Sequence, residues 1–307
     1  MKSTSISDEA EAVVSARNKR ALEKSAAMRK LLSDAPTFLL ADGPVTAAKA
    51  ALVDHLFYLV LDLIKRGDAT SLKRLLDDVF PWQPVPVSED VFFVSKNDCI
   101  HVDDSAFSSP ILLYDFSTSV QPSTSSSIWE ALNYLKPTGF DDLVRQCLGM
   151  VIELDGRQQG EHLESYTITA LRGSIYMDYH PMDIRNAETL VHESGHNWLN
   201  YLFDHFGEPL PSRPVWFSPW RGEERPVAGI VHGIVAFSFV VRFLRSALEF
   251  IDLPAAEQTY AMSQIKSQVA RLSALRSTFP EVLSHIATPK LRGIISDLYY
   301  GAFSDDA

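Results

Sequence analysis

The chain has few cysteines and a shortage of positive charge. Only two of its 307 residues are cysteine, Cys99 and Cys147, too few and too far apart for a disulfide framework or a cysteine metal site. Its 28 lysines and arginines are outnumbered by 39 aspartates and glutamates, which gives a net charge of −11. This negative charge opposes binding to nucleic acid and to anionic membranes. We therefore expect neither nucleic acid nor a membrane as a partner.

The chain also lacks a signal peptide and a segment that would comfortably span a bilayer. Its first 34 residues mix charges throughout and contain no apolar core of the kind that a signal peptide requires. The uncharged run at residues 227–241 is too short to span a bilayer comfortably and is interrupted by two glycines and a histidine. It is typical of a buried core helix. We expect a cytoplasmic protein whose two cysteines stay reduced.

What the sequence does contain is enough apolar content, 46% of the residues, to bury a substantial core. Helical periodicity near both ends and short β-like runs between residues 91 and 177 predict an α+β fold, predominantly α-helical, with a minor β component. We expect an N-terminal helical section at residues 1–86 and a metal-binding catalytic domain at residues 87–307, unless the two form one continuous domain.

The stretch His192-Glu193-Ser194-Gly195-His196 predicts a metal site. Apolar residues around it recur at three- and four-residue spacing, which predicts a helix over residues 186–206. Residues four apart lie one turn apart on the same face of a helix, so His192 and His196 can bind one divalent metal. Glu193 can then reach a metal-bound water or orient a ligand. Glu193 is therefore the candidate catalytic residue.

A catalytic metal is expected to have a third protein ligand, and the sequence leaves its identity open. The extended zinc-protease pattern HExxHxxGxxH fails, because Leu199 and Leu202 replace its glycine and its third histidine. Glu223 and Glu224 are candidates that would suit a peptidase. His232 is the other candidate, in the apolar run that we expect to form a core helix.

The apolar surroundings of His232 support two interpretations. A histidine in such a helix is more often an ordinary core residue than a ligand. However, a buried polar group without a partner costs about 1–3 kcal/mol, and a metal held by the facing helix would supply that partner. Gly229 and Gly233 flank His232 and would allow the two helices to approach closely. The predicted metal site would then lie between two core helices.

Three segments together carry a resemblance to a known family. They are residues 192–196, residues 217–226 with the sequence FSPWRGEERP, and residues 229–233 with the sequence GIVHG. The set resembles the bacterial HExxH-motif peptide-modification family of ribosomal peptide natural-product pathways. Members share HExxH, a Ser/Ala-Pro-Trp-Arg segment, an Arg-Pro pair and a Leu-His-Gly-like segment that opens an apolar helix. The resemblance covers residues 165–250, about a quarter of the chain.

The resemblance implies an iron(II)- and 2-oxoglutarate-dependent oxygenase that hydroxylates a side-chain carbon of a precursor peptide. His192, His196 and His232 would bind the iron. Arg221 or Arg225 would pair with the acidic cosubstrate, since the planar guanidinium suits bidentate contact with a carboxylate. Glu193 would act beside the metal, orienting a ligand or a bound water.

Two other functions stay open. One is a zinc metallopeptidase in which Glu193 activates a zinc-bound water as general base. Three neutral imidazoles would suit zinc, whereas the usual non-haem iron oxygenase has two histidines and one carboxylate. The other is a noncatalytic metal- or peptide-binding protein. All three motif residues are intact, which argues against a decayed site.

Overall fold

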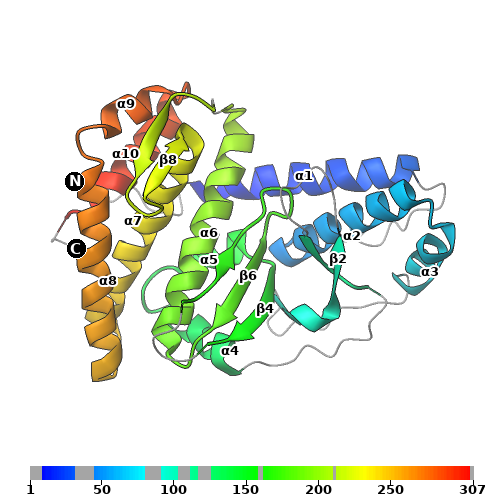
Figure 1. Cartoon of the computed structure of the whole chain (residues 1–307), viewed down its shortest axis with the longest axis horizontal. Helices are drawn as coiled ribbons and strands as arrows, with labels where there is room; N and C mark the ends of the chain where they lie inside the picture. Colours follow the sequence, from blue (N-terminus) through cyan, green and yellow to red (C-terminus); the bar gives the residue numbers. More distant parts are fainter. Residues whose placement is uncertain are drawn as a thin grey trace. The chain divides into compact units, whose positions relative to one another are not determined.

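The structure is a computed structural model that describes residues 9–31, 45–79, 91–102, 111–116, 126–157, 162–209 and 212–304 (Figure 1). These residues form mainly α-helices together with small β-sheets, which confirms the predicted α+β class with predominant helix. The chain divides into two compact units. The first comprises residues 1–13, 127–144 and 180–307, and the second comprises residues 14–126 and 145–179. The predicted boundary between residues 86 and 87 lies outside the described residues.

The second unit contains most of α1 (Ala10–Leu31), then α2 (Ala47–Arg66) and α3 (Ala69–Val79). Helix α2 begins where the Thr46 side chain accepts a hydrogen bond from the backbone N–H of Lys49, at 3.2 Å. It ends at Gly67, which has a left-handed φ of 67°. Both ends of this helix are therefore set by local sequence.

The main sheet of the second unit has the strand order β1-β4-β6-β5, formed by β1 (Phe92–Ser95), β4 (Met150–Gly156), β6 (Ser174–Tyr179) and β5 (Ser165–Tyr166). Strands β1, β4 and β6 are parallel, and β5 is antiparallel to β6. The strands β2 (Cys99–Val102) and β3 (Ile111–Tyr114) pair antiparallel, and the short 3-10 helix η2 (Lys96–Asp98) precedes them. Gly149 precedes β4, and a Cβ there would lie only 2.1 Å from the carbonyl oxygen of Ala47. This close backbone approach requires glycine.

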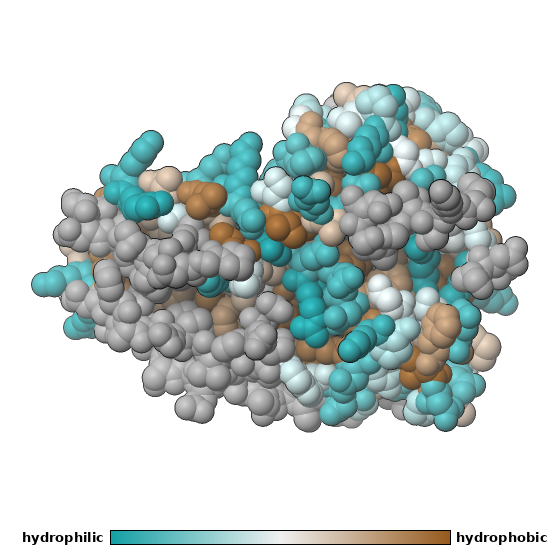
Figure 2. All heavy atoms as spheres, turned by 180° about the vertical axis from the view of Figure 1, so that it is seen from behind, coloured by the Kyte–Doolittle hydropathy of each residue, from teal (hydrophilic) through white to brown (hydrophobic). Residues whose placement is uncertain are grey.

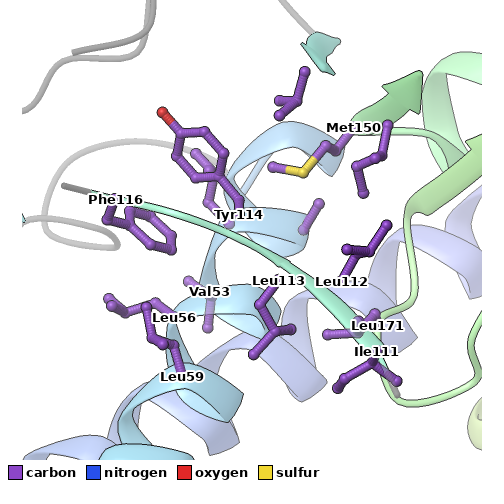
Figure 3. Close-up of a cluster of buried hydrophobic side chains, with 14 of the residues drawn as sticks. Val53, Leu56, Leu59, Ile111, Leu112, Leu113, Tyr114, Phe116, Met150 and Leu171 are labelled. Carbon is purple, nitrogen blue, oxygen red and sulfur yellow. The ribbon is translucent and has the colours of Figure 1, made fainter. Parts of the chain in front are cut away.

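The core of the second unit lies where α2 packs against β3 and β4 (Figure 3). Leu56, Leu113 and Phe116 are among its buried side chains. His55 is fully buried within it. The His55 Nδ1 accepts a hydrogen bond from the backbone N–H of Tyr114, and Nε2 lies 3.0 Å from the Ser174 hydroxyl. These two contacts fix a neutral imidazole with its proton on Nε2.

The first unit is built around α7 (Val227–Phe250), which packs against α6 (Asp183–Phe206), α8 (Ala255–Ala274) and α10 (Pro289–Gly301). Its smaller elements are α4 (Ser126–Asn133), most of α5 (Asp141–Cys147), α9 (Phe279–Ser284) and the strands β7 (Val215–Ser218) and β8 (Glu223–Pro226). Figure 1 shows α7 and α8 side by side. The core helix that contains the uncharged run 227–241 was predicted over residues 227–250, and α7 confirms it with these bounds.

Helix α7 is, among the described residues, the one helix long and apolar enough to cross a membrane. However, 67% of its most apolar window is buried inside the protein, as in the core helix of a soluble protein. On the face shown in Figure 2, hydrophilic and hydrophobic residues are interspersed. Helix α7 therefore packs against other helices of the first unit as a core helix.

The structure differs from the sequence-based expectation at three places. Pro209, Pro211 and Pro214 predicted an extended connection, and directly after it residues 215–226, for which no strands were predicted, contain the antiparallel hairpin of β7 and β8. The helix predicted over residues 281–300 is divided into α9 and α10, and Pro289 begins the second helix. The strand expected at residues 166–171 is limited to Ser165–Tyr166. Most of the serine-rich stretch expected to form a loop, residues 117–125, lies outside the described residues.

Candidate metal centre

Helix α6 carries the HExxH motif and is fixed at its N-terminus by side chains. The Asn186 side chain accepts a hydrogen bond from the backbone N–H of His180 and donates one to its carbonyl oxygen, at 2.8 and 2.7 Å. The Glu257 carboxylate of α8 accepts hydrogen bonds from the backbone N–H groups of Asp183 and Ile184. A carboxylate at this end satisfies N–H groups that have no partner within the helix and favours the helix dipole. The helix therefore starts three residues before the predicted position.

His192 and His196 lie one turn apart on α6 with their Nε2 atoms 3.1 Å from each other. Two nitrogens about 2.1 Å from one metal ion lie about 3 Å apart when they occupy neighbouring coordination positions. The observed separation fits two ligands of a single ion. Both residues are partly buried, and the His192 side chain is 19% exposed. The nitrogens are therefore close to solvent as well as to each other.

Both motif histidines are held neutral. Burial, with a contribution from the positive charge of Arg221, lowers the pKa of His192 to about 4. Burial and the neighbouring charges of His192, His232 and Arg221 lower the pKa of His196 well below its usual value. A neutral imidazole has a nitrogen lone pair available for a metal. Both imidazoles are therefore unprotonated at neutral pH, as metal binding requires.

Glu193 lies beside the first motif histidine, as its position in the sequence predicts. Its side chain is buried, and its Oε1 is 4.0 Å from His192 Nε2. This distance is too long for a hydrogen bond. The carboxylate is therefore a neighbour of the nitrogen that would bind a metal, close enough to act on a molecule bound there.

His232 projects from α7 toward α6, but it meets the other side of His196. Its Nδ1 is 3.1 Å from His196 Nδ1, while His196 Nε2 faces His192. In the part of the chain that the structure describes, no group of three or more His, Cys, Asp or Glu side chains is arranged to hold a metal ion. The exposed residues Glu223 and Glu224, on β8, do not complete such a group. Among the described residues, the two imidazoles of His192 and His196 are therefore the donors whose separation fits one metal ion.

The turn of the β7–β8 hairpin brings Trp220 to the metal centre. The indole ring stacks on Phe237 with 4.9 Å between centroids and 6° between planes, and Phe237 lies 4.6 Å from the His192 ring. Trp220 Nε1 donates a hydrogen bond to Gln268 of α8, at 3.1 Å. A Cβ at Gly233 would lie 2.9 Å from the indole, so glycine is needed beneath it. The hairpin thereby supplies an aromatic wall next to His192.

The two candidate arginines have different surroundings. Arg221 is exposed, and its charge is close enough to lower the pKa of both motif histidines. Arg225 donates a hydrogen bond to Glu223 Oε1 at 3.0 Å, and its side chain covers Gly229, where a Cβ would lie 3.2 Å from Nε. Of the two predicted cosubstrate residues, Arg221 is the one whose charge acts on the histidine pair.

The close approach of α6 and α7 depends on Gly195, inside the HExxH motif. A Cβ at this position would lie 3.0 Å from the Phe239 ring and 3.3 Å from the Ala236 Cα. The expectation that Gly229 and Gly233 bring the two helices together is wrong. Those glycines are covered by Arg225 and Trp220, because they face the hairpin.

Sequence reasoning missed a polar pair beside the motif. Glu188 precedes His192 by one helical turn, and its Oε2 accepts a hydrogen bond of 2.6 Å from the Tyr260 hydroxyl of α8. Burial raises the pKa of Glu188 to about 7. The spacing of Glu188, His192 and His196, four residues each, could have indicated a shared face. Nothing in the sequence near Glu188 indicates that its hydrogen-bond partner is Tyr260 of α8.

Comparison with known proteins gives no family for the chain: no family model matches it, and no curated protein matches its sequence. The function must therefore be argued from the residues of the metal centre and from the motif pattern. Within that centre, the arrangement on α6 and the charge of Arg221 are the two features with direct chemical meaning.

Proposed function

We propose that the chain is an iron(II)- and 2-oxoglutarate-dependent oxygenase that hydroxylates a side-chain carbon of a ribosomally made precursor peptide. The observation that carries the proposal is the pair of neutral imidazoles, His192 and His196, with Nε2 atoms 3.1 Å apart on one face of α6. When bound, iron would supply the chemistry by which dioxygen and 2-oxoglutarate become succinate and carbon dioxide while a C–H bond becomes C–OH. The chain's own residues bind, orient and shield the reactants.

The position of Arg221 favours an acidic cosubstrate. Its positive charge is near enough to lower the pKa of both motif histidines, and the same charge would attract a carboxylate bound at the candidate metal centre. A guanidinium can donate two parallel hydrogen bonds to a carboxylate. Trp220 and Phe237 would exclude water from one side of His192.

Glu193 supports a zinc metallopeptidase as the second candidate function. Its Oε1 lies 4.0 Å from His192 Nε2, near enough to accept a proton from a water bound beside that nitrogen. In the oxygenase, the same carboxylate would orient a metal ligand or a water. The two functions therefore differ in what Glu193 does and share the histidine pair.

The metal and the turnover of 2-oxoglutarate test this proposal together. Protein purified without oxygen should contain about one iron per chain and, once dioxygen is admitted, should form succinate and carbon dioxide from 2-oxoglutarate, even slowly, without a peptide. His192→Ala and His196→Ala should each lose the metal. His205→Ala, on an exposed position later in the same helix, is the matched control and should retain it.

Other outcomes would overturn the proposal. Zinc in place of iron, with peptide cleavage lost in Glu193→Gln, would identify the peptidase. A stoichiometric metal with neither succinate formation nor cleavage would identify a noncatalytic binding protein. Protein that binds no metal under any of these conditions would refute the metal centre.

We also propose a cytoplasmic location. Cys99 and Cys147 are both free thiols, and Cys147 is fully buried, which fits a reducing compartment. The net charge of −11 fits a peptide partner better than nucleic acid or an anionic membrane.

A further inference from the structure

Both ring nitrogens of His196 face another imidazole. Nε2 is 3.1 Å from His192 Nε2, and Nδ1 is 3.1 Å from His232 Nδ1. The two nitrogens of one imidazole point away from different edges of the ring. His192 and His232 therefore approach His196 from different sides, and they do not face a common point through their nearest nitrogens.

The distance between the two Nδ1 atoms is that of a hydrogen bond, which requires one donor and one acceptor. A neutral imidazole carries one N–H. If His196 donates from Nδ1, its Nε2 keeps a lone pair that points toward His192. If His196 accepts instead, its own proton sits on Nε2 and blocks metal binding. Only the first arrangement is compatible with a metal at the motif.

We infer that His232 is a positioning residue that accepts the Nδ1–H hydrogen bond of His196 and so directs the His196 Nε2 lone pair to the metal. This inference rests on the metal site of the proposed function, and it replaces the role of third ligand that the resemblance implies for His232. Metal-binding histidines almost always donate their other N–H to a fixed acceptor, which sets both tautomer and ring orientation. Here the acceptor is an imidazole on the facing helix.

The packing around His232 holds it in this position. It projects from α7, and its ring lies 5.9 Å from the Phe203 ring of α6, nearly at right angles. The next residue, Gly233, lies directly beneath the Trp220 indole. With His232 behind His196, the protein supplies two imidazoles from one helical turn. The remaining coordination positions are left for water, cosubstrate or a carboxylate, and the Glu193 carboxylate lies beside His192.

The test compares two substitutions of His232 that differ in whether they leave a hydrogen-bond acceptor where His232 carries Nδ1. Asparagine carries Oδ1 the same number of bonds from Cα as histidine carries Nδ1, so His232→Asn keeps an acceptor for His196. His232→Ala removes it. The probes are Fe(II) without oxygen and Co(II), titrated into full-length apoprotein against a competing chelator. The visible spectrum of the Co(II) form reports the ligand set.

We expect His232→Ala to bind one metal per chain with affinity reduced about 10- to 100-fold, the usual effect of losing such an outer partner. His232→Asn should recover most of the affinity and show the wild-type Co(II) spectrum. If His232→Ala does not fold, the affinity and spectrum of His232→Asn decide alone.

The opposite result is equally clear. If His232→Asn loses stoichiometric metal as His192→Ala does, or shifts the Co(II) spectrum to that of a site with one imidazole fewer, His232 is a ligand and the inference is overturned. In that case the wild-type protein still binds metal, so the proposed function survives. If the wild-type protein binds neither probe, the proposed function itself has failed.

Discussion

At the scale of single residues, Arg221 and Arg225 show how similar side chains acquire different tasks. Arg225 already has an anionic partner, Glu223, and its side chain covers Gly229. Arg221 sits in the turn of the hairpin, and its charge acts on the two motif histidines. A charged side chain that is exposed next to the candidate metal centre is available to an incoming anion. In the proposed oxygenase, we therefore assign the cosubstrate carboxylate to Arg221.

Substitution of the two arginines should separate these roles. Arg221→Ala should raise the 2-oxoglutarate concentration needed for half-maximal succinate formation by about 10- to 100-fold, since a hydrogen bond to a charged group contributes about 1.5–3 kcal/mol. Arg225→Ala is the control and should change this 2-oxoglutarate concentration by less than about 3-fold. Arg221→Lys should lie between them because lysine keeps the charge and loses the planar fork. Equal effects in the two alanine variants would contradict the assignment.

Residue identity was easier to predict than residue orientation. The four-residue spacing of His192 and His196 requires only a helix to bring them together, and α6 does so. The contact of His232 with Nδ1 of His196 depends on the rotation of α7 about its axis and on the ring torsion of His232. Neither the rotation of α7 nor the ring torsion of His232 can be predicted from the spacing of residues in the sequence. For the same reason, the pairing of Glu188 with Tyr260 could not be predicted.

At the scale of helices and strands, the packing of α6 on α7 is limited by one small residue. Gly195 costs about 1 kcal/mol relative to alanine in a helix interior. At this position of α6, an added methyl group would lie only 3.0 Å from the Phe239 ring. The space between the helices is thus more important here than helix propensity.

A pair of glycine substitutions tests this balance. Gly195→Ala should destabilise the protein by about 1–2 kcal/mol, because overpacking outweighs the gain in helix propensity. Gly293→Ala, in α10, is the matched control. A Cβ there would meet nothing within 4 Å, so we expect stabilisation of up to about 1 kcal/mol. Chemical denaturation of each variant measures both effects, and a stabilised Gly195→Ala variant would refute the packing limit.

The elements that sequence predicted best are those determined by their own periodicity or composition. The apolar run of α7 and the amphipathic α6 belong to this group. The N-terminus of α6 was predicted too late in the sequence because Glu257 lies on a different helix. Its carboxylate accepts hydrogen bonds from the first backbone N–H groups of α6. The β7–β8 hairpin was missed because nearby prolines suggested an extended segment, whereas Pro226 itself lies at the end of β8. Local signals cannot report a distant partner.

At the scale of the whole molecule, the buried imidazole of His55 makes stability depend on pH. Burial, with a smaller contribution from Lys24, lowers the pKa of His55 to about 3. In the unfolded chain His55 has the ordinary histidine pKa of about 6.5, so the unfolded state holds more protons than the folded state between pH 3 and pH 6.5. The contribution of His55 to stability is therefore nearly constant above about pH 7 and falls as the pH decreases toward 3.

The change is large enough to measure. Between pH 7 and pH 4.5, His55 alone should reduce the free energy of unfolding by about 2–3 kcal/mol, from 1.36 kcal/mol per pKa unit. His55→Gln should be less stable at pH 7, since it disturbs the bonds to Ser174 and Tyr114, but should lose less stability over this range. Substitution of the exposed His101 controls for loss of an imidazole. An unchanged pH dependence in His55→Gln would contradict the prediction.

The fold class could be predicted from composition and periodicity, but the organisation into units could not. Strand β1 pairs with β4, and β4 with β6, through parallel contacts that join residues far apart in sequence. Each unit also collects segments from separate parts of the chain. Periodicity along the sequence does not report such a division, because it describes one segment at a time.

The candidate metal centre is formed by one continuous stretch of chain. His192, His196, the β7–β8 hairpin, His232 and the α8 residue Gln268 all follow one another within residues 180–307. The contacts within this stretch still close long loops: 36 residues separate His196 from His232, and 48 separate Trp220 from Gln268. These loops are similar in length to the one closed when Phe92 of β1 pairs with Met150 of β4, so chain entropy alone favours neither contact. Because all residues of the candidate centre follow β6 in the sequence, a nascent chain presents the strands of its sheet before it presents the histidine pair.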